Sequence, residues 1–216
     1  MANKLNIIAI QTGPLAVNTY IVWRDGSDKC VVIDPASSGK VLEQTKKLSL
    51  TVAAILITHG HFDHILGVSK LAEETGAKVI ISRIDAPMLK DGKACLASLI
   101  GVRFDPAKAD VLLKDGAVFT EAGVTFRALL TPGHTKGGMC FVVEDDKVVF
   151  SGDTLFFSSY GRTDLPGGDS AALCDSIIYR LFSLKGDYRV LPGHDRETTL
   201  DYERSNNPCA IYGICQ

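Results

Sequence analysis

The stretch "THGHFDH" at residues 58–64 limits most narrowly how this chain can fold. It holds three of the five histidines of a 216-residue chain within six positions. An even scatter of five histidines would place roughly 0.14 in such a window, so chance is a poor explanation. The apolar run "VAAILI" precedes the stretch and a helical pattern follows it. The histidines are therefore expected at a strand-to-helix junction.

The other two histidines and one aspartate occupy the same kind of position. His134 in "LLTPGHTKGG" and His194 in "RVLPGHDRET" each follow an apolar run and a Pro-Gly turn, and Asp153 follows the run "VVFSG". Loops at strand ends carry functional residues on a rigid scaffold. A lone turn histidine is more often just hydrogen-bonded, and Asp63 alone could be a helix N-cap. Together, the set indicates a metal site: His59, His61, Asp63, His64, His134, Asp153 and His194.

The donor types limit which metals the site can bind. Imidazole and carboxylate groups without cysteine suit zinc, iron or manganese, and are typical of hydrolytic or oxygen-handling sites. The H-x-H spacing lets His59 and His61 point toward one ion, while Asp63 and His64 at the helix start can point toward a second. Asp153 is the candidate bridging carboxylate. We expect two divalent ions, with zinc preferred and iron or manganese as alternatives.

Composition limits the partners. With 46% apolar and 22% charged residues, the chain is expected to form a single domain over residues 1–216. A net charge of −2 and no basic run argue against nucleic acid and anionic membrane surfaces, which leaves a small-molecule substrate. The six cysteines form no C-x-x-C pair, and no run approaches the roughly 18 apolar residues of a membrane span. We expect reduced thiols, a cytoplasmic location, and a monomer or small homo-oligomer.

Periodicity predicts strands followed by helices, twice over. The first three strands, 5–11, 18–24 and 29–34, suggest an antiparallel meander. The other predicted strands are 52–58, one short strand within 78–108, 110–114, 124–130, 139–144, 147–153 and 188–193. The predicted helices are 39–49, 63–74, two short ones within 78–108, 169–183 with Asp169 as N-cap, and 198–206. Two sheets packed face to face with helices outside would satisfy this order.

The motifs "THGHFDH", "TPGHT", "SGDT" and "LPGH", in this order, resemble those of the metallo-β-lactamase superfamily. The likeness runs from the first strands to the last helix. It implies an α/β (α+β) fold, a four-layer αβ/βα sandwich of two mixed β-sheets flanked by helices, with the site at the edge between the sheets. It also implies that His59, His61 and His134 hold one ion, that Asp63, His64 and His194 hold the other, and that Asp153 bridges both.

Other motifs point to a branch of that superfamily. Asp153 stands where the largest group of zinc β-lactamases has a cysteine ligand, which argues against antibiotic hydrolysis. The segments "GDTLFFSSYGRTDLPGGD" and "LPGHDRETTLDYERSNNP" resemble the glyoxalase II-like hydrolases of the short bacterial type, which lack a C-terminal helical domain. The resemblance implies thioester hydrolysis of the hydroxyacylglutathione (S-lactoylglutathione) type by a hydroxide that bridges the two metals. Asp63 and Asp153 would be its catalytic carboxylates.

Substrate recognition is the least specific part of the likeness. Arg162 in "GRTD" stands where the long enzymes have a substrate-binding lysine, and could pair with a carboxylate. A surface or inter-loop salt bridge is an equal alternative for Arg162. The two tyrosine positions of the long enzymes are filled by Asp164 and Arg196, and the helical domain that contacts glutathione is missing. These differences argue against glutathione as the thiol part of the substrate.

Two other functions fit the same motifs. Persulfide dioxygenases of the superfamily share "GRTD" and keep a single iron on the equivalents of His59, His134 and Asp153. A metal-binding protein without hydrolase activity is the second alternative. An open coordination position favours catalysis over storage.

Overall fold

The computed structural model describes residues 3–212, so Cys215 lies outside the described residues. Its first sheet has six strands in chain order: β1 (Leu5–Thr12), β2 (Val17–Arg24), β3 (Lys29–Ile33), β4 (Thr51–Ile57), β5 (Lys78–Ser82) and β6 (Val111–Leu113). The strands β1 to β3 are antiparallel, which confirms the predicted meander. From β3 to β6 the pairing is parallel, so the sheet is mixed.

The second sheet also has six strands, in the order β14, β13, β10, β9, β8, β7. Only β10 and β13 pair in parallel, so this sheet is mixed as well. Its strands are β7 (Val118–Glu121), β8 (Val124–Leu130), β9 (Met139–Val143), β10 (Val148–Gly152), β13 (Arg189–Pro192) and β14 (Thr198–Thr199). A small hairpin of β11 (Leu155–Phe156) and β12 (Ser159–Tyr160) follows β10.

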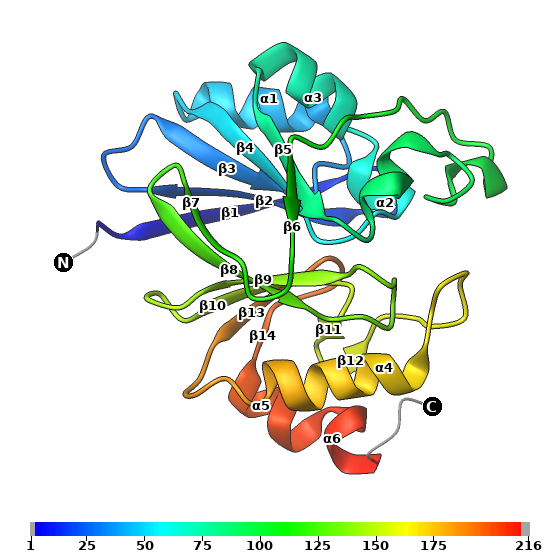
Figure 1. Ribbon diagram of the computed structural model, residues 1–216. Coiled ribbons are helices and arrows are strands. Elements are labelled where there is room, and N and C mark those ends of the chain that lie inside the picture. Colours follow the sequence, from blue (N-terminus) through cyan, green and yellow to red (C-terminus); the bar gives the residue numbers. More distant parts are fainter. Residues whose placement is uncertain (1–2, 213–216) are drawn as a thin grey trace.

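Helices cover the outer face of each sheet (Figure 1). The first sheet carries α1 (Ser38–Lys47) and α3 (Val68–Thr75), and the second carries α4 (Ser170–Asp175), α5 (Leu200–Asn206) and α6 (Pro208–Tyr212). The shorter helical segments are α2 (Phe62–Ile65), the 3-10 turns η1 (Ala86–Lys90) and η2 (Ala97–Leu99), and the π-helical turn η3 (Ser176–Leu181). The arrangement confirms the four-layer sandwich.

Strand alternation builds three apolar layers. In β4, Ala54 and Leu56 face the second sheet, whereas Ile55 and Ile57 face the helices, because successive side chains of a strand point to opposite faces. The layer between the sheets contains Phe126, Phe141 and Phe150, all fully buried. A third cluster packs the second sheet against α4, η3 and α5. Both faces of each sheet are thus covered, and the strand ends remain for loops.

The predicted helix 63–74 is wrong as a single element. The chain forms α2 and α3 with a break at Leu66–Gly67. The Gly67 N–H donates to the Pro35 carbonyl at 2.9 Å, and a Cβ at Gly67 would lie 2.5 Å from that oxygen. The helix is interrupted because the loop after β3 packs against it at this point.

Other predicted elements are confirmed with changes at their ends. Asp169 is the N-cap of α4, since its carboxylate accepts from the Ala172 N–H at 3.0 Å. The predicted helix 198–206 begins at Leu200, because Thr198–Thr199 pair with β13 as β14. The prediction missed β7, β14, the β11–β12 hairpin and α6. Within residues 3–212, no helix is long and apolar enough to cross a membrane.

Candidate metal centre

All seven predicted ligands lie together at one edge of the sandwich, between the two sheets. The segment that follows β4 in the first sheet, including α2, supplies four of them: His59, His61, Asp63 and His64. The second sheet supplies the other three, from the β8–β9 loop, the end of β10 and the end of β13: His134, Asp153 and His194. Their ligand atoms form three overlapping groups, and within each group these atoms lie within 4.8 Å of one another.

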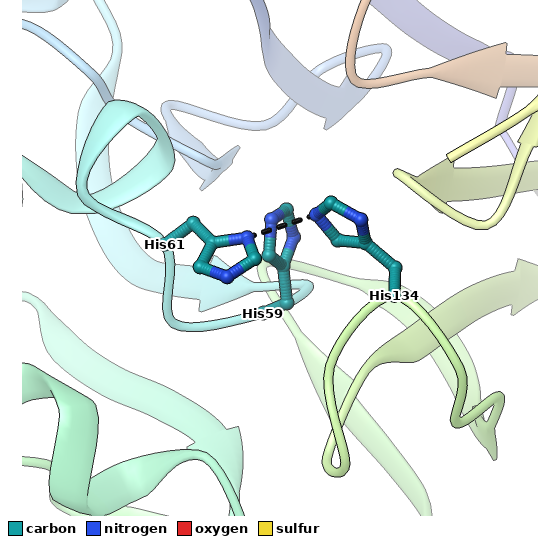
Figure 2. A group of neighbouring side chains, drawn as sticks. All are labelled: His59, His61 and His134. Carbon is teal, nitrogen blue, oxygen red and sulfur yellow. Dashed lines mark hydrogen bonds between the residues drawn. The ribbon is translucent and has the colours of Figure 1, made fainter. Parts of the chain in front are cut away.

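The first group is His59, His61 and His134, whose rings converge from the loops after β4 and β8 (Figure 2). The Nδ1 atom of His61 lies 2.8 Å from the Nε2 atom of His134. Nitrogen ligands of a tetrahedral zinc ion, each about 2.05 Å from the metal, lie roughly 3.3 Å apart. His61 and His134 are hydrogen-bonded and a little closer than that, and the ligand atoms of all three rings lie within 4.8 Å of one another, so a small shift of the rings would place them around one ion.

The second group is Asp63, His64 and His194. The Oδ2 atom of Asp63 lies 3.3 Å from His194 Nε2 and 3.7 Å from His64 Nε2. Helix α2 has His61 as its N-cap residue, so Asp63 lies inside the first turn rather than capping it. Its carboxylate is thus directed at the two imidazoles, in the spacing of a second metal site.

Asp153 connects the two groups. Its Oδ1 atom lies 3.3 Å from His64 Nε2, and its Oδ2 atom lies 3.5 Å from His134 Nε2 and 3.6 Å from His194 Nε2. One carboxylate thereby faces ligands of both groups. This is the geometry expected of a bridge between two cations.

Several of these atoms have no hydrogen-bond partner. Among residues 3–212, four of the five buried side-chain polar atoms without a partner belong to the cluster: His59 Nε2, His61 Nε2, His64 Nε2 and Asp153 Oδ1. Burying such atoms unsatisfied costs about 1–3 kcal/mol each, so folded proteins seldom leave several in one place. Metal ions would satisfy His59 Nε2, His64 Nε2 and Asp153 Oδ1, whereas His61 faces its group with Nδ1. The donor set suits a binuclear site.

Hydrogen bonds to neighbouring groups determine which nitrogen carries the proton in three of the imidazoles. The Thr58 hydroxyl donates to Asp34 at 2.6 Å, so it accepts the Nδ1–H of His59 at 3.1 Å. His134 donates its Nδ1–H to the Arg162 carbonyl at 2.7 Å, and His64 donates its Nδ1–H to Asp34 at 2.9 Å. All three rings thus present Nε2 lone pairs to the cluster. Hydrogen bonds of this kind orient metal-binding histidines.

The electrostatics of the cluster favour a cation. Burial lowers the pKa of His61 to about 3, and with the neighbouring imidazoles it holds the pKa of His59 well below its usual value. Both are neutral, as metal ligands must be. Burial also opposes charge on His64, but Asp153, Asp34 and Asp63 outweigh it and raise the pKa of His64. The carboxylates therefore attract positive charge to the side of the cluster nearest them.

Two buried carboxylates that support the cluster were missed by the sequence analysis. Asp34 accepts from Thr58 and His64, as described above. Asp85 accepts from the Gly60 N–H at 3.1 Å, the Thr135 hydroxyl at 2.7 Å and the Gly137 N–H at 2.8 Å. It therefore ties the loop of His59 to the loop of His134. Asp34 follows the apolar run "CVVI", so the strand-end pattern that identified Asp153 could have identified it too.

A cavity of about 600 Å³ opens above the cluster, with His61, Asp63, His134, Asp153 and His194 on its floor. Arg162 is one of the residues that line it, and its exposed side chain forms a two-pronged salt bridge with Asp164, at 2.7 Å for each contact. Both readings of Arg162 thus have a structural counterpart, and its contact with substrate stays a prediction. Arg196 instead lies over the Phe157 ring, 3.5 Å from its centroid.

Curated relatives of similar length resemble this chain along almost its whole sequence. The probable metallo-hydrolase YqgX of Bacillus subtilis is 34% identical, with 91% of this chain and 93% of the relative covered. The hydroxyacylglutathione hydrolase GloC of Haemophilus influenzae is 30% identical over 94% of this chain and 96% of its own. These two relatives and the donor set together indicate a metal-dependent hydrolase.

Solved structures share the fold. The BLEG-1 B3 metallo-beta-lactamase superposes with a TM-score of 0.90 at 33% identity, over 95% of this chain and 100% of that one. TTHA1623 in a di-iron-bound form superposes with a TM-score of 0.82 at 37% identity, over 93% and 98%. The profile of the metallo-beta-lactamase superfamily matches residues 12–194. The chain therefore belongs to the metallo-β-lactamase superfamily.

Proposed function

We propose that the chain hydrolyses thioesters of the hydroxyacylglutathione type, with S-lactoylglutathione as the test substrate, and that it uses two divalent metal ions. The observation that carries this proposal is the Asp153 carboxylate, which lies between two complete groups of three ligands on the floor of an open cavity. A single-iron dioxygenase would not need the second group, Asp63, His64 and His194. The likeness to GloC supports the thioester class.

The residues would divide the work as follows. His59, His61 and His134 would hold the first ion through neutral nitrogens, and Asp63, His64 and His194 would hold the second. When bound, such ions lower the pKa of water toward about 7 and polarise a carbonyl group. Asp63 and Asp153, which line the cavity, would hold the ions where a substrate in the cavity can reach them. A thiolate, with a conjugate-acid pKa of about 8.5, leaves without a strong general acid.

Zinc is the proposed metal, with iron as the alternative. The six ligands around Asp153 are imidazole or carboxylate groups, and these groups bind both zinc and iron. The di-iron-bound form of TTHA1623, 37% identical to this chain, supports iron. The metal content of the purified protein, measured by plasma mass spectrometry, decides between them.

The central experiment combines metal content with turnover of S-lactoylglutathione. His59→Ala and Asp153→Ala should each lose metal and activity together, because each removes a ligand. Asp28→Ala, which removes an exposed carboxylate from the β2–β3 turn, should leave both unchanged. Full activity in either ligand variant would refute the site.

Two outcomes would replace the proposal. One iron per chain, with oxygen consumed on glutathione persulfide, would identify a dioxygenase. Bound metal without turnover of any thioester, ester or lactone would identify a metal-binding protein that is not a hydrolase.

A second candidate is β-lactam hydrolysis, which the similarity to the BLEG-1 B3 metallo-beta-lactamase favours. Asp153 argues against it, since the largest group of zinc β-lactamases has cysteine there. A chromogenic cephalosporin assayed beside S-lactoylglutathione, on the same metal-loaded protein, ranks the two by kcat/KM.

A further inference from the structure

The rim of the cavity carries an unusual amount of exposed aliphatic surface. Leu15 in the β1–β2 turn, with Leu99 and Ile100 at the end of η2, line the cavity and keep 54%, 70% and 54% of their surface exposed. One exposed leucine is ordinary, but several around one cavity mark a binding surface. Together with four further apolar residues of the lining they form the apolar wall of the cavity: Phe62, Leu96, Phe156 and Leu165.

This aliphatic wall begins directly above the ionic floor. Phe62 is the residue between His61 and Asp63, and the Phe156 ring centroid lies 6.2 Å from that of His194. A carbonyl group placed at the cluster therefore has an apolar surface beside it. Whatever is attached to that carbonyl on this side must pass along the wall to reach solvent.

The acyl half of a thioester suits this wall better than the thiol half. Glutathione carries two carboxylates and several amide groups, which would be poorly hydrated against aliphatic side chains. Arg162 is among the residues that line the same cavity, and its cation suits those carboxylates. An S-lactoyl group has one methyl group and a hydroxyl, and would leave most of the wall uncovered.

We propose that the wall formed by Leu15, Leu99 and Ile100 binds the aliphatic acyl chain of the substrate, so that the enzyme prefers medium-chain acyl thioesters to short hydroxyacyl ones. This inference rests on the proposed thioesterase function and names its substrate class. Each methylene that moves from water onto the wall should raise kcat/KM about two- to fourfold.

The test is a series of S-acyl glutathiones, from acetyl through butanoyl and hexanoyl to octanoyl, with the metal-loaded enzyme. We expect kcat/KM to rise along the series. Leu99→Asn should lower kcat/KM for the octanoyl substrate about tenfold more than it lowers kcat/KM for the acetyl substrate. Leu112→Asn is the matched control, since Leu112 is 56% exposed on the edge strand β6, and should change neither value.

Binding of the product carboxylates gives a readout that does not need turnover. By calorimetry, octanoate should bind at least tenfold more tightly than acetate, and Leu99→Asn should remove most of that difference. If this holds but no thioester is hydrolysed, the proposed function fails and the acyl-chain site stands.

Two results would overturn the inference while leaving the thioesterase intact. One is a kcat/KM that does not change with acyl length, together with octanoate binding no tighter than acetate. The other is a series at constant acetyl group in which apolar thiols, rather than apolar acyl chains, raise kcat/KM, which would assign the wall to the thiol.

Discussion

The Nδ1 atom of His64 lies 2.9 Å from the Oδ2 atom of Asp34, a residue 30 positions earlier that directly follows the third strand of the first sheet. In the neutral, metal-binding form of His64 this contact keeps the proton on Nδ1 and the lone pair on Nε2, toward Asp63 and Asp153. The loop after β3 thus decides how a histidine of the loop after β4 can act.

Replacing Asp34 tests this relationship. In Asp34→Asn the amide N–H₂ would face Thr58 and His64 where a carboxylate accepted, which favours the His64 tautomer with the proton on Nε2. We expect a 10- to 100-fold loss of metal affinity, measured by titration against a chelator of known affinity. Asparagine tolerates the φ of 50° at this position, so circular dichroism should show an unchanged fold. Unchanged affinity would remove Asp34 from the support of the site.

A methyl group at Gly193 should displace two ligands. A Cβ there would lie 2.4 Å from Asp153 Oδ1 and 2.7 Å from His64 Cε1. Gly193→Ala is therefore expected to lower metal content and activity at least tenfold, by metal analysis and a thioester assay. The control is Gly39→Ala in α1, where a Cβ meets nothing within 4 Å and alanine favours the helix by about 1 kcal/mol. Normal metal binding by Gly193→Ala would contradict the observed packing.

Asp85→Ala should destabilise the fold itself. It would leave the N–H groups of Gly60 and Gly137 and the Thr135 hydroxyl buried without an acceptor, at about 1–3 kcal/mol each. We expect the free energy of unfolding in urea to fall by about 3 kcal/mol or more. Asp91→Ala removes an exposed carboxylate that also accepts two N–H groups, and should cost less than about 1 kcal/mol. Equal losses in the two variants would show that Asp85 has no special role.

Arg162→Ala should raise KM for an anionic thioester, by about fivefold, more than it lowers kcat, because a remote cation contributes mainly uniform binding. The substitution leaves the Arg162 carbonyl, and so the His134 contact, in place. Arg103 offers a matched control, since it is exposed and pairs with Asp105 two residues later, as Arg162 does with Asp164. Steady-state kinetics in which both variants keep the wild-type KM would exclude Arg162 from substrate binding.

The burial of two thiols predicts that the stability of the protein depends on pH. Burial raises the pKa of the Cys30 thiol to about 12 and that of Cys140 to about 11, against about 8.5 in an unfolded chain. Because the folded state keeps these protons, stability should fall as pH rises above about 8.5. At pH 8 iodoacetamide should label neither residue until urea unfolds the protein, as peptide mass spectrometry can show. Rapid labelling of the native protein would contradict this burial.

The clustering of the seven candidate ligands could be predicted from the sequence because each follows an apolar strand, and strand ends meet at one edge of a sandwich. The break between α2 and α3 could not, because it depends on the Pro35 carbonyl, which comes near Gly67 only in the folded chain. The short strands β7 and β14 were missed for a similar reason. Their pairing partners, rather than their own patterns, make them strands.

The segment 78–108 shows most clearly what sequence reasoning left out. It was expected to form a strand and two short helices, which it does, but no function was assigned to it. Its turns are 3-10 segments too short for a periodic pattern. Nevertheless it supplies Asp85, which joins the ligand loops, and Leu99 and Ile100 at the cavity rim.

The position of the cluster between the sheets has a consequence for folding as well as for catalysis. Each group of three ligands takes two from the first half of the chain and one from the second: His59 and His61 with His134, and Asp63 and His64 with His194. Neither half can complete a coordination sphere alone. Bound cations would therefore act as cross-links between the halves, and the free energy of unfolding would rise with the logarithm of the metal affinity.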